Sequence, residues 1–131
     1  MKKFISLLTL MFAFIAISSG QAIAMTGSGD SLSNTASKSC TFRAVGTPTS
    51  VSIEYVLTKA SGTVAGKTYL YGSLDGVTYV AIDSMTATNQ TTNAKIFIVT
   101  SPKAYVYYKT THTGVGTMKV YLKALILVRK E

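Results

Sequence analysis

From Cys40 onward, apolar and polar residues alternate with a period of two, and this pattern constrains the fold more than any other feature of the chain. In the segment 51–59, the apolar residues would share one face of a strand: Val51, Ile53, Tyr55 and Leu57. Alternation is typical of a half-buried β-strand, and no window shows the sustained stripe of an amphipathic helix. We therefore expect an all-β domain over residues 40–131.

Glycine, proline and polar clusters divide this region into about seven short strands. We expect them at Cys40–Val45, Val51–Lys59, Lys67–Leu74, Val77–Asp83, Ala94–Thr100, Tyr105–His112 and Thr117–Val128. Short strands separated by regular turn signals predict a small antiparallel β-sandwich. Immunoglobulin-like and jelly-roll topologies both stay open, because the pattern does not give strand connectivity.

Two hairpins are expected from turn chemistry. Asp75-Gly76 suits a two-residue type I′ turn, which would place Leu74 opposite Val77 and Gly72 opposite Tyr79. Gly114-Val115-Gly116 suits a three-residue loop with Gly116 in the left-handed conformation, which would pair Thr113 with Thr117.

The register of the second hairpin predicts a candidate binding face. Its members are three tyrosines and three lysines: Tyr105, Tyr107, Lys109, Lys119, Tyr121 and Lys123. Tyrosine offers a large contact area at low rotamer cost, and lysine attracts anions. Such a face can stack sugars, hold a single strand of nucleic acid or dock a protein. The alternative is an ordinary solvent-facing sheet surface.

Leu125 and Leu127 share the parity of Lys123, so we expect them beside the candidate face, where they would contact a neighbouring subunit or shell. The competing interpretation places both leucines in the domain's own core, under a crossing loop.

The N-terminus has the organisation of a secretory signal. Lys2 and Lys3 precede the apolar stretch Phe4–Ile17, and Ala22-Ile23-Ala24 is a small-x-small cleavage site. The stretch is shorter than the ~20 residues of a membrane-spanning helix. We expect residues 1–24 to be removed after Ala24. A retained hydrophobic anchor, or a true start at Met25, is the alternative. Residues 25–39 are almost wholly polar and predict a flexible leader.

The distribution of charge and the number of cysteines indicate which kinds of partner the chain can have. Residues 25–94 carry four basic and four acidic residues, whereas residues 95–131 carry seven basic residues and Glu131. This asymmetry favours an acidic partner, with general solubility as the alternative. Cys40 is the single cysteine, so we expect it to be buried and reduced, or else paired with another chain.

Catalytic patterns are missing from the sequence. The single histidine, His112, lies beside an expected turn, and we interpret it as a solvated loop residue. The five acidic residues include no close pair that would suggest a glycosidase or a carboxylate metal cluster. We expect no enzyme activity, no metal and no cofactor.

Two segments resemble a known family. The stretch from Thr68 to Val80 contains Gly72-Ser73-Leu74-Asp75-Gly76 before Tyr79, and Tyr107-Tyr108-Lys109 leads to Gly114-Val115-Gly116-Thr117. They resemble β-sandwich domains of tailed-phage virion proteins that decorate heads or tails. The first also resembles, more weakly, discoidin-like carbohydrate-binding modules. The resemblance covers about two-thirds of residues 25–131.

The resemblance implies a non-enzymatic structural protein that self-associates or docks on a larger shell. A secreted module that binds cell-surface glycan is the alternative, and a fibre or adhesin subunit is the third. We expect an exported location (periplasm, cell surface or exterior), or the virion if a phage encodes the chain. The expected partners are the chain itself, other virion or surface proteins, a glycan or an acidic surface. We do not expect nucleic acid, and we expect a membrane only through residues 1–24.

Overall fold

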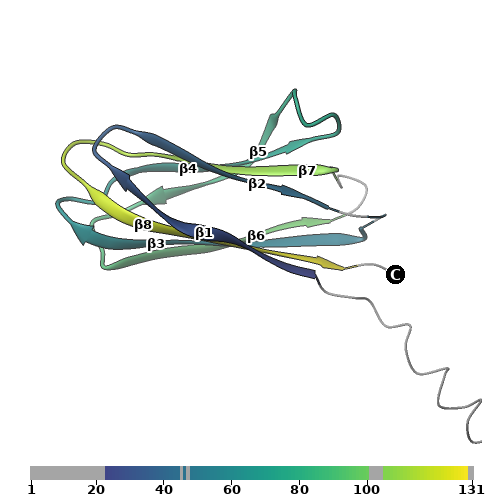
Figure 1. The fold of residues 1–131 in the computed structure, drawn as a ribbon, viewed down its shortest axis with the longest axis horizontal. Helices are drawn as coiled ribbons and strands as arrows, with labels where there is room; N and C mark the ends of the chain where they lie inside the picture. Colours follow the sequence, from purple (N-terminus) through teal and green to yellow (C-terminus); the bar gives the residue numbers. More distant parts are fainter. Residues whose placement is uncertain (1–22, 45, 47, 101–104, 130–131) are drawn as a thin grey trace, which may run out of the picture.

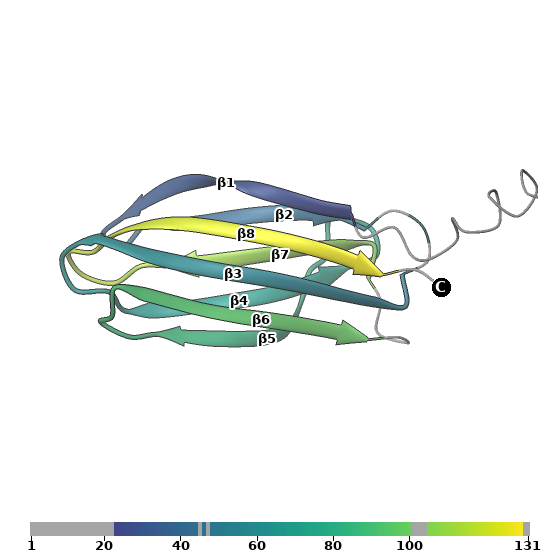
Figure 2. The same cartoon turned by 90° about the horizontal axis from the view of Figure 1, so that it is seen from below.

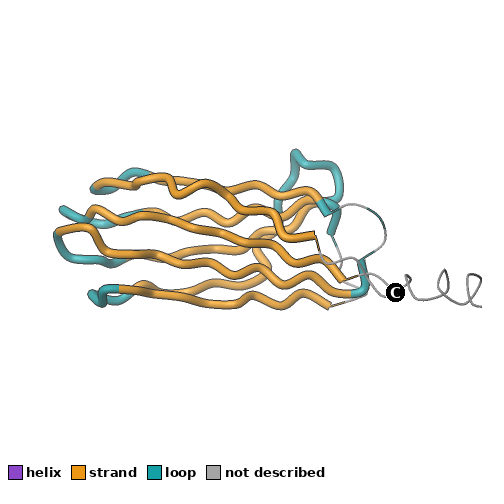
Figure 3. The backbone as a smooth tube through the Cα atoms, turned by 60° about the horizontal axis from the view of Figure 1, so that its bottom comes forward, coloured by secondary structure: helices purple, strands orange, loops and turns teal. Residues whose placement is uncertain are grey.

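The computed structural model describes residues 23–44, 46, 48–100 and 105–129, and these residues form eight strands and no helix (Figure 3). The strands are β1 (Ile23–Ser33), β2 (Ser37–Arg43), β3 (Ser50–Ser61), β4 (Gly66–Ser73), β5 (Val80–Ala87), β6 (Thr92–Thr100), β7 (Tyr107–Thr113) and β8 (Lys119–Arg129). Within the described ranges, no helix of the length and hydropathy needed to cross a membrane is found.

The strands form two antiparallel sheets of four strands, packed face to face (Figures 1 and 2). Sheet A has the order β1-β8-β3-β6, and sheet B has the order β2-β7-β4-β5. Only β4 and β5 are consecutive strands that pair, so every other connection crosses from one sheet to the other. Eight strands in this arrangement form a jelly roll. The expected β-sandwich is confirmed, and the topology that the sequence left open is now defined.

The core lies between the sheets and is built from alternate residues of the strands. The four apolar residues expected on one face of β3 are at most 1% exposed. Their neighbours in the core include Leu70 of β4, Phe97 of β6 and Tyr108 of β7. Alternation along a strand sends successive side chains to opposite faces, so each strand also presents a row of residues outward.

The expectation of a flexible leader over residues 25–39 is wrong. Residues 23–33 form β1, which pairs along β8, and β2 begins at Ser37. The backbone ladder with β8 orders this polar segment, and Leu32, which is 1% exposed, adds a contact with the core. The signal-peptide prediction falls mostly on residues outside the described ranges. Ala24 is the second residue of β1, and cleavage after it stays a prediction.

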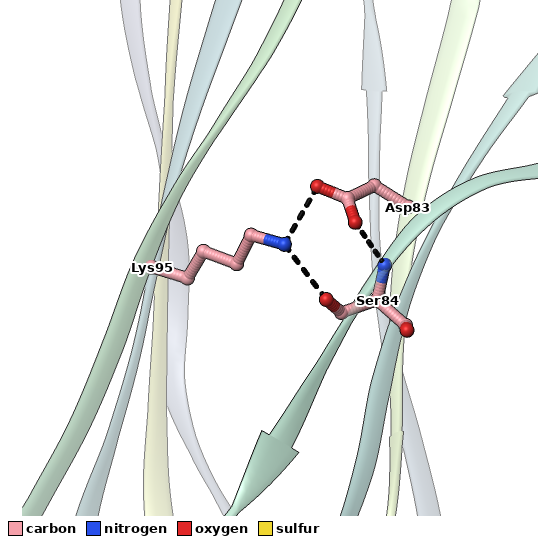
Figure 4. A network of polar contacts seen from close by, with 3 residues as sticks. All are labelled: Asp83, Ser84 and Lys95. Carbon is pink, nitrogen blue, oxygen red and sulfur yellow. Dashed lines mark hydrogen bonds and ion pairs between the residues drawn. The ribbon is translucent and has the colours of Figure 1, made fainter.

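Lys95 links β5 and β6, which are edge strands of the two different sheets. Lys95 of β6 lies 2.7 Å from a carboxylate oxygen of Asp83 on β5, and it donates a 2.8 Å hydrogen bond to the Ser84 carbonyl (Figure 4). Its ammonium also lies 4.9 Å from the centre of the Phe97 ring. A charged side chain at an edge discourages pairing with a further strand.

Candidate functional site

The candidate face expected from the last hairpin does not exist as one surface. β7 pairs with β2 and β4 in sheet B, whereas β8 pairs with β1 and β3 in sheet A. Tyr107 and Lys109 therefore lie on the opposite outer face from Lys119, Tyr121 and Lys123. The hairpin prediction is wrong because the connection 114–118 crosses between the sheets, and Met118 within it is buried in the core. Gly116 does adopt the left-handed conformation, with φ of 68°.

Tyr105 belongs to neither outer face. Its ring packs against the core and lies over Gly72, where an added Cβ would overlap ring atoms. The ring meets that of Tyr108 edge-on at a centroid distance of 6.2 Å. The expected pairing of Gly72 with Tyr79 is wrong as well, because Gly72 pairs with Val80.

The outer face of sheet B gathers four tyrosines and two cations from β2, β4, β7 and the β4–β5 loop. Tyr71 pairs with Lys109, and the Lys109 ammonium lies 5.3 Å from the Tyr71 ring centre and 4.0 Å from that of Tyr79. The Arg43 guanidinium lies 5.7 Å from the Tyr107 ring centre. Tyr69 and Tyr71 are neighbours at 6.0 Å. We call this surface the tyrosine–cation face: Arg43, Tyr69, Tyr71, Tyr79, Tyr107 and Lys109.

Part of the tyrosine–cation face could have been predicted from the sequence. Tyr69 and Tyr71 alternate around the buried Leu70, so their shared outward face was readable. Their approach to Lys109 and Arg43 was not readable, because it depends on β4 and β2 flanking β7. The remaining outward positions of β2 and β7 are hydroxyl residues, two pairs of which are hydrogen-bonded at 2.7 and 2.8 Å.

The outer face of sheet A carries an apolar groove. Leu125 and Leu127 of β8 are half-buried on the side that also bears Lys123, so their expected parity is confirmed. They face Glu54 and Ser52 of β3 across the ladder, and β6 adds Ile96, which is 60% exposed. The volume of the groove is about 270 Å³. We call it the apolar groove: Ser52, Glu54, Ile96, Leu125 and Leu127. Neither leucine belongs to the core between the sheets.

The connection from β4 to β5 is a six-residue loop, Leu74–Tyr79, and not the expected two-residue turn. One Asp75 carboxylate oxygen accepts hydrogen bonds from the Ser73 hydroxyl and from the backbone N–H groups of Val77 and Thr78, each at 2.8 Å. The two backbone bonds, followed by that from Ser73, lower the pKa of Asp75 to about 2. Gly76 has φ of 76° and lies against the Tyr107 ring. The loop is therefore held in one conformation although it is exposed.

Two titratable residues, His112 and Cys40, lie in the core or against it. His112 is fully buried on β7, so its interpretation as a solvated loop residue is wrong. Its Nδ1 lies 2.9 Å from the Thr68 hydroxyl, and burial lowers its pKa. The Cys40 side chain is half-buried against the core, on the face of β2 that it shares with Phe42. Among the described residues, no three His, Cys, Asp or Glu side chains gather as metal ligands would.

Comparison with known proteins gives relatives by fold. No protein-family model and no curated protein matches the sequence. The PBSX exported protein XepA superposes with a TM-score of 0.62 at 12% identity, covering 83% of this chain and 38% of that one. The enzymatically active domain of tailspike protein 4 from bacteriophage CBA120 superposes at 0.56 with 10% identity, covering 85% and 18%.

A family 16 carbohydrate-binding module superposes at a TM-score of 0.49 with 11% identity, covering 72% of this chain and 71% of the module. The chain spans 38% of XepA and 18% of the tailspike domain, well under half of each. Its resemblance to β-sandwich domains of phage proteins is confirmed at the level of the fold.

Proposed function

We propose that this chain is a non-enzymatic structural subunit that self-associates through the apolar groove of sheet A. The observation that carries the proposal is a set of large apolar side chains on an outer sheet face. Ile98, which is 68% exposed, extends the groove along the edge strand β6, beyond Ile96. Contiguous apolar surface of this kind marks interaction sites in soluble proteins.

The partner that we assign is a second copy of the chain. The same molecule exposes apolar side chains on its β4–β5 loop, including Val77 at 82%, so it carries apolar surfaces on two separate sides. The single histidine is buried, and this supports a role without acid–base chemistry. The fold likeness to an exported phage-related protein and to a tailspike domain supports assembly into a virion or another external structure.

Light scattering after size exclusion tests this proposal. The wild-type chain should elute as species larger than a monomer, in proportions that rise with concentration. Ile96→Asp and Leu127→Asp should each shift the chain to a monomer, because a buried carboxylate without a partner is costly. Ile96 is mostly exposed, so its substitution should leave the thermal transition intact. Val115→Asp, at a 53% exposed position in the 114–118 connection, is the matched control and should assemble like wild type.

A second candidate function is favoured by one contact, the Lys109 ammonium between the rings of Tyr71 and Tyr79. The tyrosine–cation face combines cations, aromatic rings and hydroxyl groups, a chemistry that suits an anionic glycan. Because a cation already lies over three of its rings, the face is less suited to stacking nucleic-acid bases.

Retention on an immobilised sulfated or uronate-containing polysaccharide tests this second function. Lys109→Gln should abolish retention, whereas Lys123→Gln, which removes an equal charge from the opposite face, should preserve it. Equal losses from both variants would indicate non-specific attraction between a basic protein and a polyanion.

A further inference from the structure

The β4–β5 loop is an apolar projection held in a fixed conformation. Leu74 is 70% exposed and Val77 is 82% exposed, although Asp75 between them anchors the loop through three hydrogen bonds. Figure 1 shows this loop rising from sheet B, away from sheet A. A rigid loop that presents apolar side chains loses little entropy when it binds, so it is suited to insertion into a partner.

The apolar groove lies on the opposite outer face, toward the same end of the sandwich. Leu127 is two residues from the end of β8, and Figure 1 shows β8 ending at the side of the molecule where the loop rises. The β4–β5 loop and the apolar groove therefore lie at the same end of the sandwich and face in opposite directions. Two copies stacked in the same orientation would bring the loop of one toward the groove of the next.

We infer that the β4–β5 loop of one copy inserts into the apolar groove of the next copy, with Leu74 and Val77 as the inserted side chains. This inference rests on the proposed function and specifies how the copies meet. The contact is heterologous, since it joins two different surfaces. Each added copy leaves one loop and one groove unoccupied, so the assembly is an open stack unless the rotation between copies closes a ring.

The one charged side chain that lines the groove is opposite in sign to the two cations beside the loop, and Lys123 of β8 lies outside the groove on the same face. Lys109 contacts Tyr79 at the end of the loop, and Arg43 lies over Tyr107, on which Gly76 of the loop rests. The groove contains the exposed carboxylate of Glu54. Insertion brings the two cations of one copy toward Glu54 of the next, which fixes the direction of stacking. Charges at the rim of an interface tune the association rate more than the affinity.

Mixing two assembly-defective variants tests the inference. Val77→Asp disables the projection and leaves the groove intact, and Ile96→Asp does the reverse. Each variant alone should be monomeric by sedimentation velocity. An equimolar mixture should form a dimer and nothing larger. The intact loop of the Ile96→Asp chain can insert into the intact groove of the Val77→Asp chain, whereas the substituted loop and the substituted groove cannot pair. Leu74→Asp and Leu127→Asp provide a second pair, and thermal melts confirm that each variant is folded.

The other outcomes each overturn the inference in a distinguishable way. If Val77→Asp and Leu74→Asp assemble like wild type while the groove variants do not, the grooves meet each other, and the proposed function stands without the loop. If the mixture stays monomeric while wild type assembles, complementary surfaces are excluded. If wild type itself is monomeric at every concentration, the proposed function fails and the inference fails with it.

Discussion

The ring of Tyr105 covers Gly72 so closely that a side chain on this glycine has no space. Gly72 lies in β4, and Tyr105 precedes β7, so the contact joins two neighbouring strands of sheet B just before the β4–β5 loop begins. The hydrogen bond of 3.0 Å from the Val106 N–H to the Ser73 carbonyl lies directly beside it. This contact therefore fixes the base of the loop that we propose as the projection.

Gly72→Ala should lower the free energy of unfolding by about 1–3 kcal/mol, the range for an added carbon in a packed site. Chemical denaturation measures the loss. In a Tyr105→Ala background the same substitution should cost much less, because the ring that it displaces is gone. An equal cost in both backgrounds would show that the two residues are not coupled.

His112 should make the fold less stable as the pH falls below neutral. Burial lowers its pKa in the folded state, so the unfolded chain binds the proton more readily. The stabilisation by neutral His112 is complete above the unfolded pKa of about 6.5 and declines as the pH falls from that value toward the lower folded pKa. Thermal melts of wild type and His112→Gln at pH 7 and pH 5 measure this effect. The variant should lose less stability between the two pH values, and an equal loss would contradict the assignment.

Asp75→Ala should loosen the β4–β5 loop without unfolding the sandwich, since it removes three hydrogen bonds at an exposed position. Hydrogen exchange at the amides of Val77 and Thr78 should accelerate, while exchange in β3 and β8 should not change. Self-association should weaken about tenfold or less, as expected when a preorganised loop must be ordered on binding. Because the pKa of Asp75 is about 2, wild type should keep the loop ordered down to about pH 3. Loop exchange that accelerates between pH 7 and pH 4, after correction for intrinsic rates, would contradict this assignment.

The intact mass of the protein from its native source tests the export prediction. A mass that begins at Met25 agrees with cleavage after Ala24, which would remove only the first two residues of β1. A mass that includes residues 1–24 would favour the retained anchor and contradict secretion by a cleaved signal.

Alternation was enough to predict which residues of β3 and β8 face the core and which face outward, although it placed Tyr105 on an outer face when its ring packs against the core. The buried set of β3 and the outward position of Leu125 and Leu127 follow from parity alone, because the period of a strand does not depend on its partners. The bounds of β3 were close, since it is one residue longer at its start and two at its end than the expected Val51–Lys59. The expected strand Val77–Asp83 was misplaced, because β5 begins only at Val80, after the six-residue loop, and ends at Ala87.

The same signals did not predict which strands pair with one another. Gly114-Val115-Gly116 has the composition of a tight turn, but it lies in a crossing connection, and the choice is made by the long-range ladders of β7 with β4 and of β8 with β3. β1 was missed because its residues are mostly polar and its order comes from backbone hydrogen bonds with β8. The tyrosine–cation face depends on these ladders, so only its Tyr107 and Lys109 were expected from the sequence.

Sedimentation velocity of the wild-type chain across a hundredfold range of concentration tests self-association most directly. We predict a weight-average sedimentation coefficient that rises continuously with concentration, as for an open stack, and that falls to the monomer value in Ile96→Asp. A single boundary at the monomer value throughout that range would contradict the proposal that this chain is a self-associating structural subunit.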